Sequence, residues 1–170
     1  DEAVDLGYET TVAALDSATA ALPDQGAVVI VAASYNGMPT DDARAFVDWL
    51  DGSDATAPAV PYAVLGVGDR NWAETYMAIP RRIDARLAEL GATQLLPMAE
   101  ADTSGDFAGE VEDFSVALWN GLGGVFGAVA TDEPVADESL YDLRAIDGPV
   151  TAAIDARYQV QPATVLDNIP

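Results

Sequence analysis

The stretch Ala27-Val28-Val29-Ile30-Val31-Ala32-Ala33 decides the fold, because it is an unbroken apolar run of strand length. Such a run is typical of a strand that is buried on both faces of a parallel sheet. After a short loop, Thr40 and the acidic pair that follows it predict the start of a helix. The sequence therefore predicts a strand, a loop and a helix in succession. The inward face of this helix is formed by Ala43, Phe46, Val47 and Leu50.

The same succession recurs twice. Its second copy has a strand at 62–65, a loop at 66–72 and a helix whose apolar residues recur at helical spacing from 79 to 90. Its third copy has a weaker pattern, with a strand at 93–96, a loop at 99–105 and a helix at 107–122. An extended run at 8–15 precedes all three. This alternation predicts an α/β fold in three layers, in which a doubly wound parallel sheet carries helices on both faces.

The composition changes after residue 127. Thr131, Asp132, Glu133 and Pro134 form an acidic, proline-containing stretch that is typical of a linker. Beyond it, residues 150–154 and 158–165 have the pattern of strands. We therefore expect one domain over residues 1–127, an acidic linker over 128–140 and the start of another module over 141–170.

The composition also excludes several classes of function. Seven basic and 29 acidic side chains give a net charge of -22, which repels the backbone of a nucleic acid. The chain has neither Cys nor His, so it has no disulfide framework, zinc ribbon or catalytic triad that needs them. No apolar run approaches the roughly 20 residues of a membrane-spanning helix, and the acidic start lacks the pattern of a signal peptide. We expect a cytoplasmic protein with basic protein partners and no membrane or nucleic-acid partner.

Two glycine-rich loops follow the first two buried strands, and each carries a large aromatic residue. In an open parallel sheet, ligands bind at the carboxyl ends of the strands, so these loops are expected to meet. Tyr35 and Trp72 could then grip a flat conjugated ring such as a flavin from both faces, while backbone groups bond its polar edge. The alternative is that both rings only cover the end of the core, because Gly-x-Gly alone is a weak signal. The loops are Ser34-Tyr35-Asn36-Gly37 and Gly66-Val67-Gly68-Asp69-Arg70-Asn71-Trp72.

The third loop is less informative. Asp102 could accept a hydrogen bond from a sugar hydroxyl, although an acidic residue at the end of a strand is usually only solvated. The helix residues Trp49 and Trp119 are expected to pack on the sheet.

Together these motifs resemble the FMN domain of bacterial self-sufficient cytochrome P-450 monooxygenases, in which haem and reductase domains share one polypeptide. The resemblance rests on the two loops, on the stretch Phe46-Val47-Asp48-Trp49-Leu50 and on Tyr76, and it covers nearly the whole chain. It implies a flavodoxin-like fold, FMN as the cofactor and a following FAD- and NADPH-binding module. By this resemblance, Tyr35 and Trp72 would flank the isoalloxazine ring. The other expected cofactor-binding residues are Ser34, Asn36, Gly37, Gly66, Val67, Gly68, Asp69, Asn71 and, more weakly, Asp102.

One departure from this family concerns the phosphate of FMN. The family begins with a strand and a Ser/Thr-rich loop that leads into a helix, and the helix N-terminus holds the phosphate. This chain is expected to start only at the end of that helix. A flavodoxin-like sheet has the strand order 2-1-3-4-5, so the missing first strand is a central one. We therefore expect a truncated domain that folds poorly and binds FMN weakly by itself.

The resemblance also implies a mechanism. NADPH would reduce FAD in the next module, FAD would reduce FMN, and FMN would pass electrons singly to a haem-thiolate domain that hydroxylates a substrate such as a fatty acid. No side chain of this chain is needed as an acid, a base or a metal ligand, and the chain alone is expected to be inactive. Two alternatives remain. One is the FMN domain of another diflavin reductase, such as a sulfite reductase flavoprotein, and the other is a flavodoxin-like binding domain without flavin.

Overall fold

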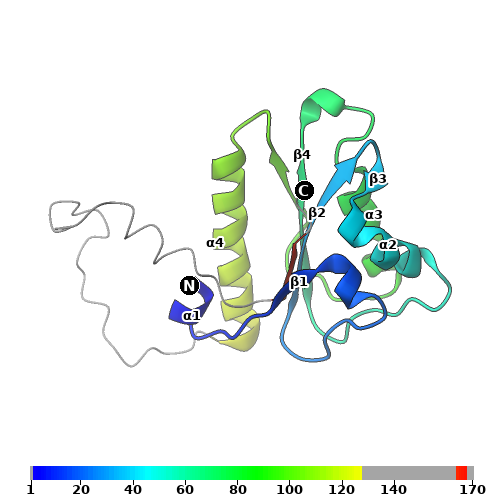
Figure 1. Ribbon diagram of the computed structural model, residues 1–170. Helices are drawn as coiled ribbons and strands as arrows, with labels where there is room; N and C mark the ends of the chain where they lie inside the picture. Colours follow the sequence, from blue (N-terminus) through cyan, green and yellow to red (C-terminus); the bar gives the residue numbers. More distant parts are fainter. Residues whose placement is uncertain (1, 128–163, 168–170) are drawn as a thin grey trace, which may run out of the picture.

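A parallel sheet forms the middle layer of the protein (Figure 1). The computed structural model describes residues 2–127 and 164–167. Within them the strands follow the order β1-β6-β2-β4-β5, and each neighbouring pair is parallel. The two-residue strand β3 (Met38–Pro39) pairs with β2 in the antiparallel sense. The other strands are β1 (Val12–Ala14), β2 (Val28–Tyr35), β4 (Tyr62–Gly68), β5 (Ala99–Asp102) and β6 (Thr164–Asp167).

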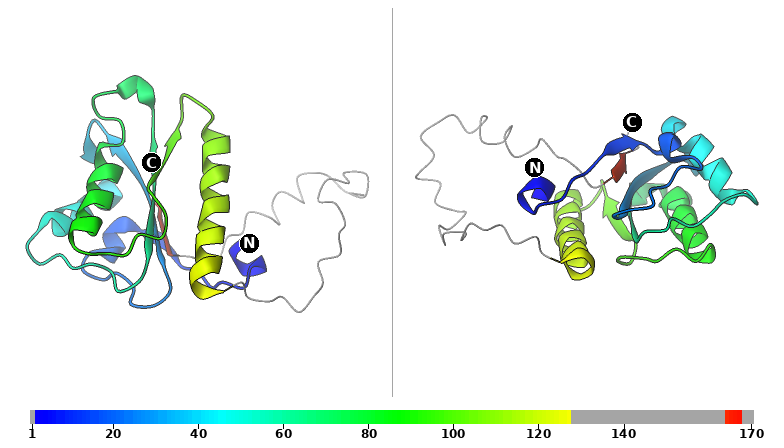
Figure 2. Two further views of the ribbon diagram at one scale, coloured as in Figure 1. Left: turned by 180° about the vertical axis from the view of Figure 1, so that it is seen from behind. Right: turned by 90° about the horizontal axis from the view of Figure 1, so that it is seen from below.

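Helices cover both faces of this sheet (Figures 1 and 2). The long helix α4 (Phe107–Phe126) lies on one face, whereas α2 (Arg44–Asp51) and α3 (Ala78–Glu89) lie on the other. The arrangement confirms the predicted doubly wound α/β class with three layers. The remaining short elements are the helix α1 (Glu2–Asp5) and the 3-10 turns η1 (Leu15–Ala18), η2 (Asp41–Ala43) and η3 (Arg70–Trp72).

Alternate residues of the central strands face the two helical layers. In β2, Val28 and Ile30 join the core on the side of α2 and α3, and Val29 joins the core on the side of α4. β4 alternates in the same way, with Val64 on the first side and Leu65 on the second. Both faces of each strand are therefore buried, which explains why the sequence of β2 is apolar without interruption.

The third predicted strand is wrong. Residues 93–96 form no strand, and Gln94 makes only an isolated bridge to Tyr62. β5 lies instead at Ala99–Asp102, where a loop was expected. The apolar pair Leu95 and Leu96 packs against the core beside α4 without joining the sheet. β5 is the last strand in the described order and buries only its final two residues, so its sequence lacks the apolar run of a central strand.

Other boundaries also differ from the prediction. β4 continues to Gly68, so the first three residues of the expected 66–72 loop belong to a strand. Of the extended run expected at 8–15, only the three residues of β1 form a strand. The last residue of the run, Leu15, already belongs to η1. Thr40 does not cap α2, because η2 intervenes and the Thr40 hydroxyl makes no side-chain capping hydrogen bond.

β6 lies between β1 and β2, with Val165 opposite Val29. In the order 2-1-3-4-5, this central place belongs to strand 1, the strand that the sequence was expected to lack. β6 has four residues and pairs with residues 28–30, whereas β2 has eight. The predicted strand at 150–154 lies outside the described residues, and the one at 158–165 reaches them only at 164 and 165.

Candidate functional site

The first loop is a tight hairpin between β2 and β3. Tyr35 pairs with Met38, so only Asn36 and Gly37 form the turn. Both have positive φ angles, 50° at Asn36 and 77° at Gly37, as a type I′ turn requires. Glycine adopts such an angle without strain, and asparagine tolerates it better than most residues. The Asn-Gly pair therefore reverses the chain directly after Tyr35 and leaves that side chain exposed at the end of the sheet.

The second loop leads from β4 into η3 and is held by two carboxylates. The Asn71 N–H donates to Asp69 Oδ1 at 2.8 Å, and the Trp72 N–H donates to the Asp69 carbonyl oxygen at 3.0 Å. The Arg70 N–H donates to Oδ1 of Asp102, the last residue of β5, at 3.1 Å. Three successive N–H groups of the loop thus have acidic residues as their partners.

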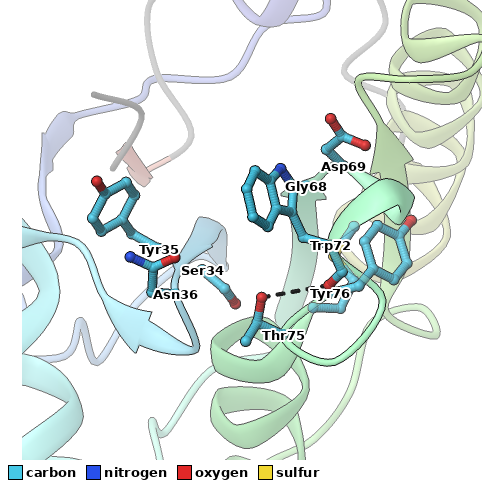
Figure 3. A pocket seen from close by; sticks show the side chains of 9 residues that line it. Ser34, Tyr35, Asn36, Gly68, Asp69, Trp72, Thr75 and Tyr76 are labelled. Carbon is cyan, nitrogen blue, oxygen red and sulfur yellow. Dashed lines mark hydrogen bonds between the residues drawn. The ribbon is translucent and has the colours of Figure 1, made fainter.

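A cavity of about 230 Å³ lies between the two loops (Figure 3). Tyr35 and Trp72 stand on opposite sides of it, and the two residues are 70% and 68% exposed. A second hollow of about 430 Å³ shares Asn36, Trp72 and Thr75 with the first. The prediction that the two loops meet at the carboxyl edge of the sheet is confirmed. The first cavity is lined by Ser34, Tyr35, Asn36, Gly68, Asp69, Trp72, Thr75, Tyr76 and Met77.

The segment between η3 and α3 supplies lining residues that the sequence analysis did not select, namely Thr75, Tyr76 and Met77. The Thr75 hydroxyl and the Tyr76 N–H both donate to the Trp72 carbonyl, at 3.4 and 2.9 Å. These bonds fold the segment back beneath Trp72. The only available signal was the resemblance, which included Tyr76 but gave it no role.

Seven of the eleven predicted cofactor-binding residues line the two hollows: Ser34, Tyr35, Asn36, Gly68, Asp69, Asn71 and Trp72. Gly37, Gly66, Val67 and Asp102 do not. A Cβ on Gly66 would lie 2.5 Å from the Met77 sulfur, so Gly66 allows close packing between β4 and the start of α3. A Cβ on Gly37 would lie 3.2 Å from Thr75 Cγ2. That any of the eleven contacts a cofactor stays a prediction.

The Ser34 hydroxyl has a defined structural role. Its oxygen accepts the Ile79 N–H at 2.9 Å, which ties the end of β2 to the first turn of α3. The free N–H groups of a first helical turn are often satisfied in this way. Ser34 therefore fixes the position of α3 relative to the hairpin and also lines the cavity.

Asp102 is almost completely buried. Its Oδ1 accepts the Ser104 N–H at 3.0 Å and the Ser104 hydroxyl at 2.7 Å, in addition to the Arg70 N–H, and Oδ2 lies 3.7 Å from Arg70 Nε. Burial alone would raise the pKa of this carboxyl. The hydrogen bonds from Ser104 and Arg70 and the Arg70 charge outweigh burial, so the pKa lies below its usual value of 3.8. Asp102 is therefore ionised at neutral pH.

Two arginines flank Tyr76. The guanidinium carbons of Arg70 and Arg81 lie 5.4 and 5.7 Å from the centre of its ring, within range of a cation–π contact. Arg81 also pairs with Glu100 at 2.6 Å. Burial raises the pKa of the Tyr76 hydroxyl, so that group is neutral at ordinary pH. The stack connects η3, α3 and β5 next to the cavity.

Two further observations concern residues 2–127 and 164–167 as a whole. No group of three or more acidic residues in them is arranged to hold a metal ion. None of their helices is long and apolar enough to cross a membrane.

One protein family, described as Flavodoxin, matches residues 1–115. The match includes both loops, the whole of β5 and the first part of α4. The chain belongs to the flavodoxin family. FMN is the cofactor of this family. The flavodoxin-like fold and the cofactor that the sequence suggested are thus confirmed.

Relatives of this flavodoxin-family chain include proteins named as P450–reductase fusions. Bifunctional cytochrome P450/NADPH–P450 reductase 1 of Bacillus subtilis (strain 168) is 37% identical over 163 residues, which cover 95% of this chain and 15% of the relative. The protein named reductase 2 of the same organism is 43% identical over 115 residues, which cover 67% of this chain and 11% of the relative. The bifunctional cytochrome P450/NADPH–P450 reductase of Fusarium oxysporum is 42% identical over 118 residues, which cover 66% of this chain and 11% of the relative. The chain spans less than a sixth of the length of these relatives.

The lining of the cavity fits the flat ring of FMN. Two aromatic side chains on opposite sides can stack on both faces of a conjugated ring. Gly68, at the end of β4, is also part of the lining. The lining residues of the two hollows include no Lys or Arg that could pair with a phosphate. The lining residues therefore fit the ring of FMN. None of them is a cation that could pair with its phosphate.

Proposed function

We propose that the chain is the FMN-binding, electron-transferring domain of a cytochrome P-450 monooxygenase fused to its NADPH-dependent reductase. It receives electrons from NADPH by way of FAD and passes them to a haem-thiolate domain of the same polypeptide. The observation that carries this proposal is the cavity between the opposed rings of Tyr35 and Trp72. The relatives named as fusions support the choice of donor and acceptor.

The residues of the site bind and orient the cofactor. When bound, FMN supplies the electron carrier itself. Tyr35 and Trp72 cover the two faces of the ring and keep water away from them. Backbone and amide groups of the two loops border the polar edge of the ring. None of the lining residues has to act as an acid or a base. The residues proposed to border the edge of the ring are Ser34, Asn36 and Gly37. Those proposed to form the second wall, with Trp72, are Gly66, Val67, Gly68, Asp69 and Asn71.

The charge of the chain suits transient docking to basic faces. The net charge is -22, and Asp69 and Glu74 lie at the edge of the two hollows. Complementary charge speeds encounter between partners, and salt weakens it. The proposed partners are the haem domain and an FAD/NADPH module, which would begin within residues 141–170, after an acidic linker at 128–140. The whole polypeptide would work in the cytoplasm.

The test uses the full-length polypeptide that contains this chain. FMN content is measured after purification, and NADPH-driven reduction of FAD and haem is followed by stopped-flow absorbance. Removing FMN should abolish haem reduction while FAD is still reduced, and added FMN should restore it. Haem reduction at an unchanged rate without FMN would contradict the proposal.

The same experiment separates the alternatives. A full-length polypeptide that retains FMN but carries no haem-thiolate domain would be a reductase for another acceptor, such as a sulfite reductase. A polypeptide that neither retains FMN nor binds it when it is added would be a flavin-free binding domain.

A further inference from the structure

The backbone of the loop that presents Trp72 is hydrogen-bonded to a side chain of the neighbouring strand β5. Asp102 Oδ1 accepts the Arg70 N–H at 3.1 Å, although the two residues are 32 positions apart in the chain. Next to this bond, the backbone pairing of β4 and β5 extends to Thr103, whose N–H donates to the Gly68 carbonyl at 2.7 Å. Asp102 thus stands at the point where the loop leaves the sheet.

The Asp102 carboxylate is fully engaged away from the cavity. The residue is 5% exposed and lines neither hollow. Oδ1 accepts three hydrogen bonds, two from Ser104 and one from Arg70, and Oδ2 faces Arg70 Nε. A carboxylate in this state has little capacity to bind a sugar hydroxyl, which was the role suggested by its place in the sequence.

We propose that Asp102 is a positioning residue for FMN, whose carboxylate holds the Trp72 loop in its ring-binding position by accepting the Arg70 N–H. The inference rests on the proposed FMN-binding function and gives a cause for the position of one wall of that site. The bond is charge-assisted and buried, and such bonds are stronger than bonds between neutral groups.

The remaining supports of the loop do not replace this bond. Asp69 binds the Asn71 N–H and thereby shapes η3 internally, but it belongs to the loop itself. The Arg70 side chain reaches Tyr76 and Glu100 from an exposed position, and its distance to Glu100 is 3.9 Å. Without Asp102, the Arg70 N–H has no partner, and the loop loses its hydrogen bond to the end of β5.

A pair of substitutions at residue 70 isolates the bond. Arg70→Ala removes the guanidinium and keeps the N–H. Arg70→Pro removes both. Proline suits this position because Arg70 is the first residue of η3 and the preceding Asp69 has φ -123° and ψ 118°, the extended backbone that a residue before proline prefers. The difference between the two variants therefore reports the N–H bond.

The experiment measures FMN affinity in the full-length polypeptide, after removal and return of FMN. Asp102→Ala and Arg70→Pro should each weaken FMN binding about tenfold or more, the scale of one hydrogen bond to a charged group. Arg70→Ala should weaken binding less than threefold. Both changes remove the same bond, so their effects should not add. The FMN affinity of the double variant Asp102→Ala/Arg70→Pro should lie within about twofold of that of the single variant with the lower affinity.

Hydrogen exchange gives a readout that does not depend on FMN. In the FMN-free protein, the amides of Asn71 and Trp72 should exchange faster in Asp102→Ala and in Arg70→Pro than in the wild type or in Arg70→Ala. Asp106→Ala is the matched control, since Asp106 accepts the Gly109 N–H at 3.2 Å and caps α4. This control should change neither FMN affinity nor exchange in the loop.

Three results would overturn the proposal: unchanged loop exchange in Asp102→Ala, equal behaviour of Arg70→Pro and Arg70→Ala, or additive losses in the double variant. A wild-type protein that binds no FMN would refute the proposed function instead. Hydrogen exchange would still decide whether Asp102 holds the loop.

Discussion

The two walls of the candidate FMN site are built in different ways. The turn that follows Tyr35 is made by neighbouring residues, because Asn36 and Gly37 form it and β3 pairs with β2. The Trp72 loop combines a local carboxylate, Asp69, with a remote one, Asp102, so its position requires β5 to be in place. The turn of one wall is therefore specified by a dipeptide, and the other wall depends on the assembled sheet.

The largest expected effect on the site comes from removing either ring. Trp72→Ala and Tyr35→Ala should each weaken FMN binding by about 1–3 kcal/mol, the scale of a lost aromatic stacking contact. Because both side chains are mostly exposed, the unfolding midpoint should barely change. Flavin fluorescence titration of the FMN-depleted full-length polypeptide measures the affinity.

Met38→Ala is the control for these two variants, since Met38 is also exposed on the hairpin but does not line the cavity. If the three variants weaken FMN binding equally, the two rings do not form the walls of the site.

A smaller effect is expected from the turn itself. Gly37→Ala forces a side chain into the left-handed region, which should destabilise the fold by about 1–2 kcal/mol in denaturant unfolding. Its Cβ would also press on Thr75, so FMN affinity should fall as well. Gly91→Ala is a matched control, because Gly91 has φ 84° and no atom near its missing Cβ. Equal loss of FMN affinity in both variants would show that the hairpin does not form a wall of the site.

The internal cap of the other loop should contribute less. Asp69→Ala removes the acceptor of the Asn71 N–H and should lower the free energy of unfolding by about 1 kcal/mol, as for other capping residues. With Asp102 still in place, FMN affinity should fall less than in Asp102→Ala. A larger loss in Asp69→Ala would mean that the local carboxylate, rather than the remote one, determines the position of Trp72.

The smallest effect on the site is expected at the opposite end of β4. Tyr62 is buried, and its hydroxyl donates to the Asp84 carbonyl and carboxylate, both at 3.2 Å. Tyr62→Phe should cost about 1 kcal/mol of stability and leave FMN affinity unchanged. Reduced FMN affinity in this variant would show that the two ends of β4 are coupled.

The stability of the wild type should also depend on pH through Tyr62. Burial, followed by the charge and hydrogen bond of Asp84, raises the pKa of this phenol above its usual value of 10.0. A raised pKa in the folded state means that its stabilising effect is present below pH 10 and is lost as the pH rises further. The free energy of unfolding should therefore fall more steeply above pH 10 in the wild type than in Tyr62→Phe.

Sequence patterns predicted the features that depend on local residues. The apolar run of β2 requires burial on both faces, and the aromatic residues after β2 and β4 were expected to meet because both strands are parallel. Both predictions rest on neighbouring residues and on one rule for parallel sheets, so they could be made without coordinates.

The features that were missed depend on long-range contacts. β5 could not be distinguished from a loop, because the last strand in the described order buries few residues and carries the polar sequence Ala99-Glu100-Ala101-Asp102. The structural role of Asp102 depends on a donor 32 positions earlier in the chain. The close packing at Gly66 likewise depends on a distant residue, since the space beside it is filled by Met77 from the start of α3. Sequence spacing alone indicates none of these contacts.

The three tryptophans of the chain have different environments, and this has an optical consequence. Trp49 packs beside Phe46 in the layer of α2 and α3, with ring centres 5.4 Å apart. Trp119 stacks on Tyr8 in the layer of α4, with ring centres 6.1 Å apart. Trp72 is exposed at the cavity. Variants that keep a single tryptophan would therefore give three separate fluorescence signals, one from each helical layer and one from the mouth of the site.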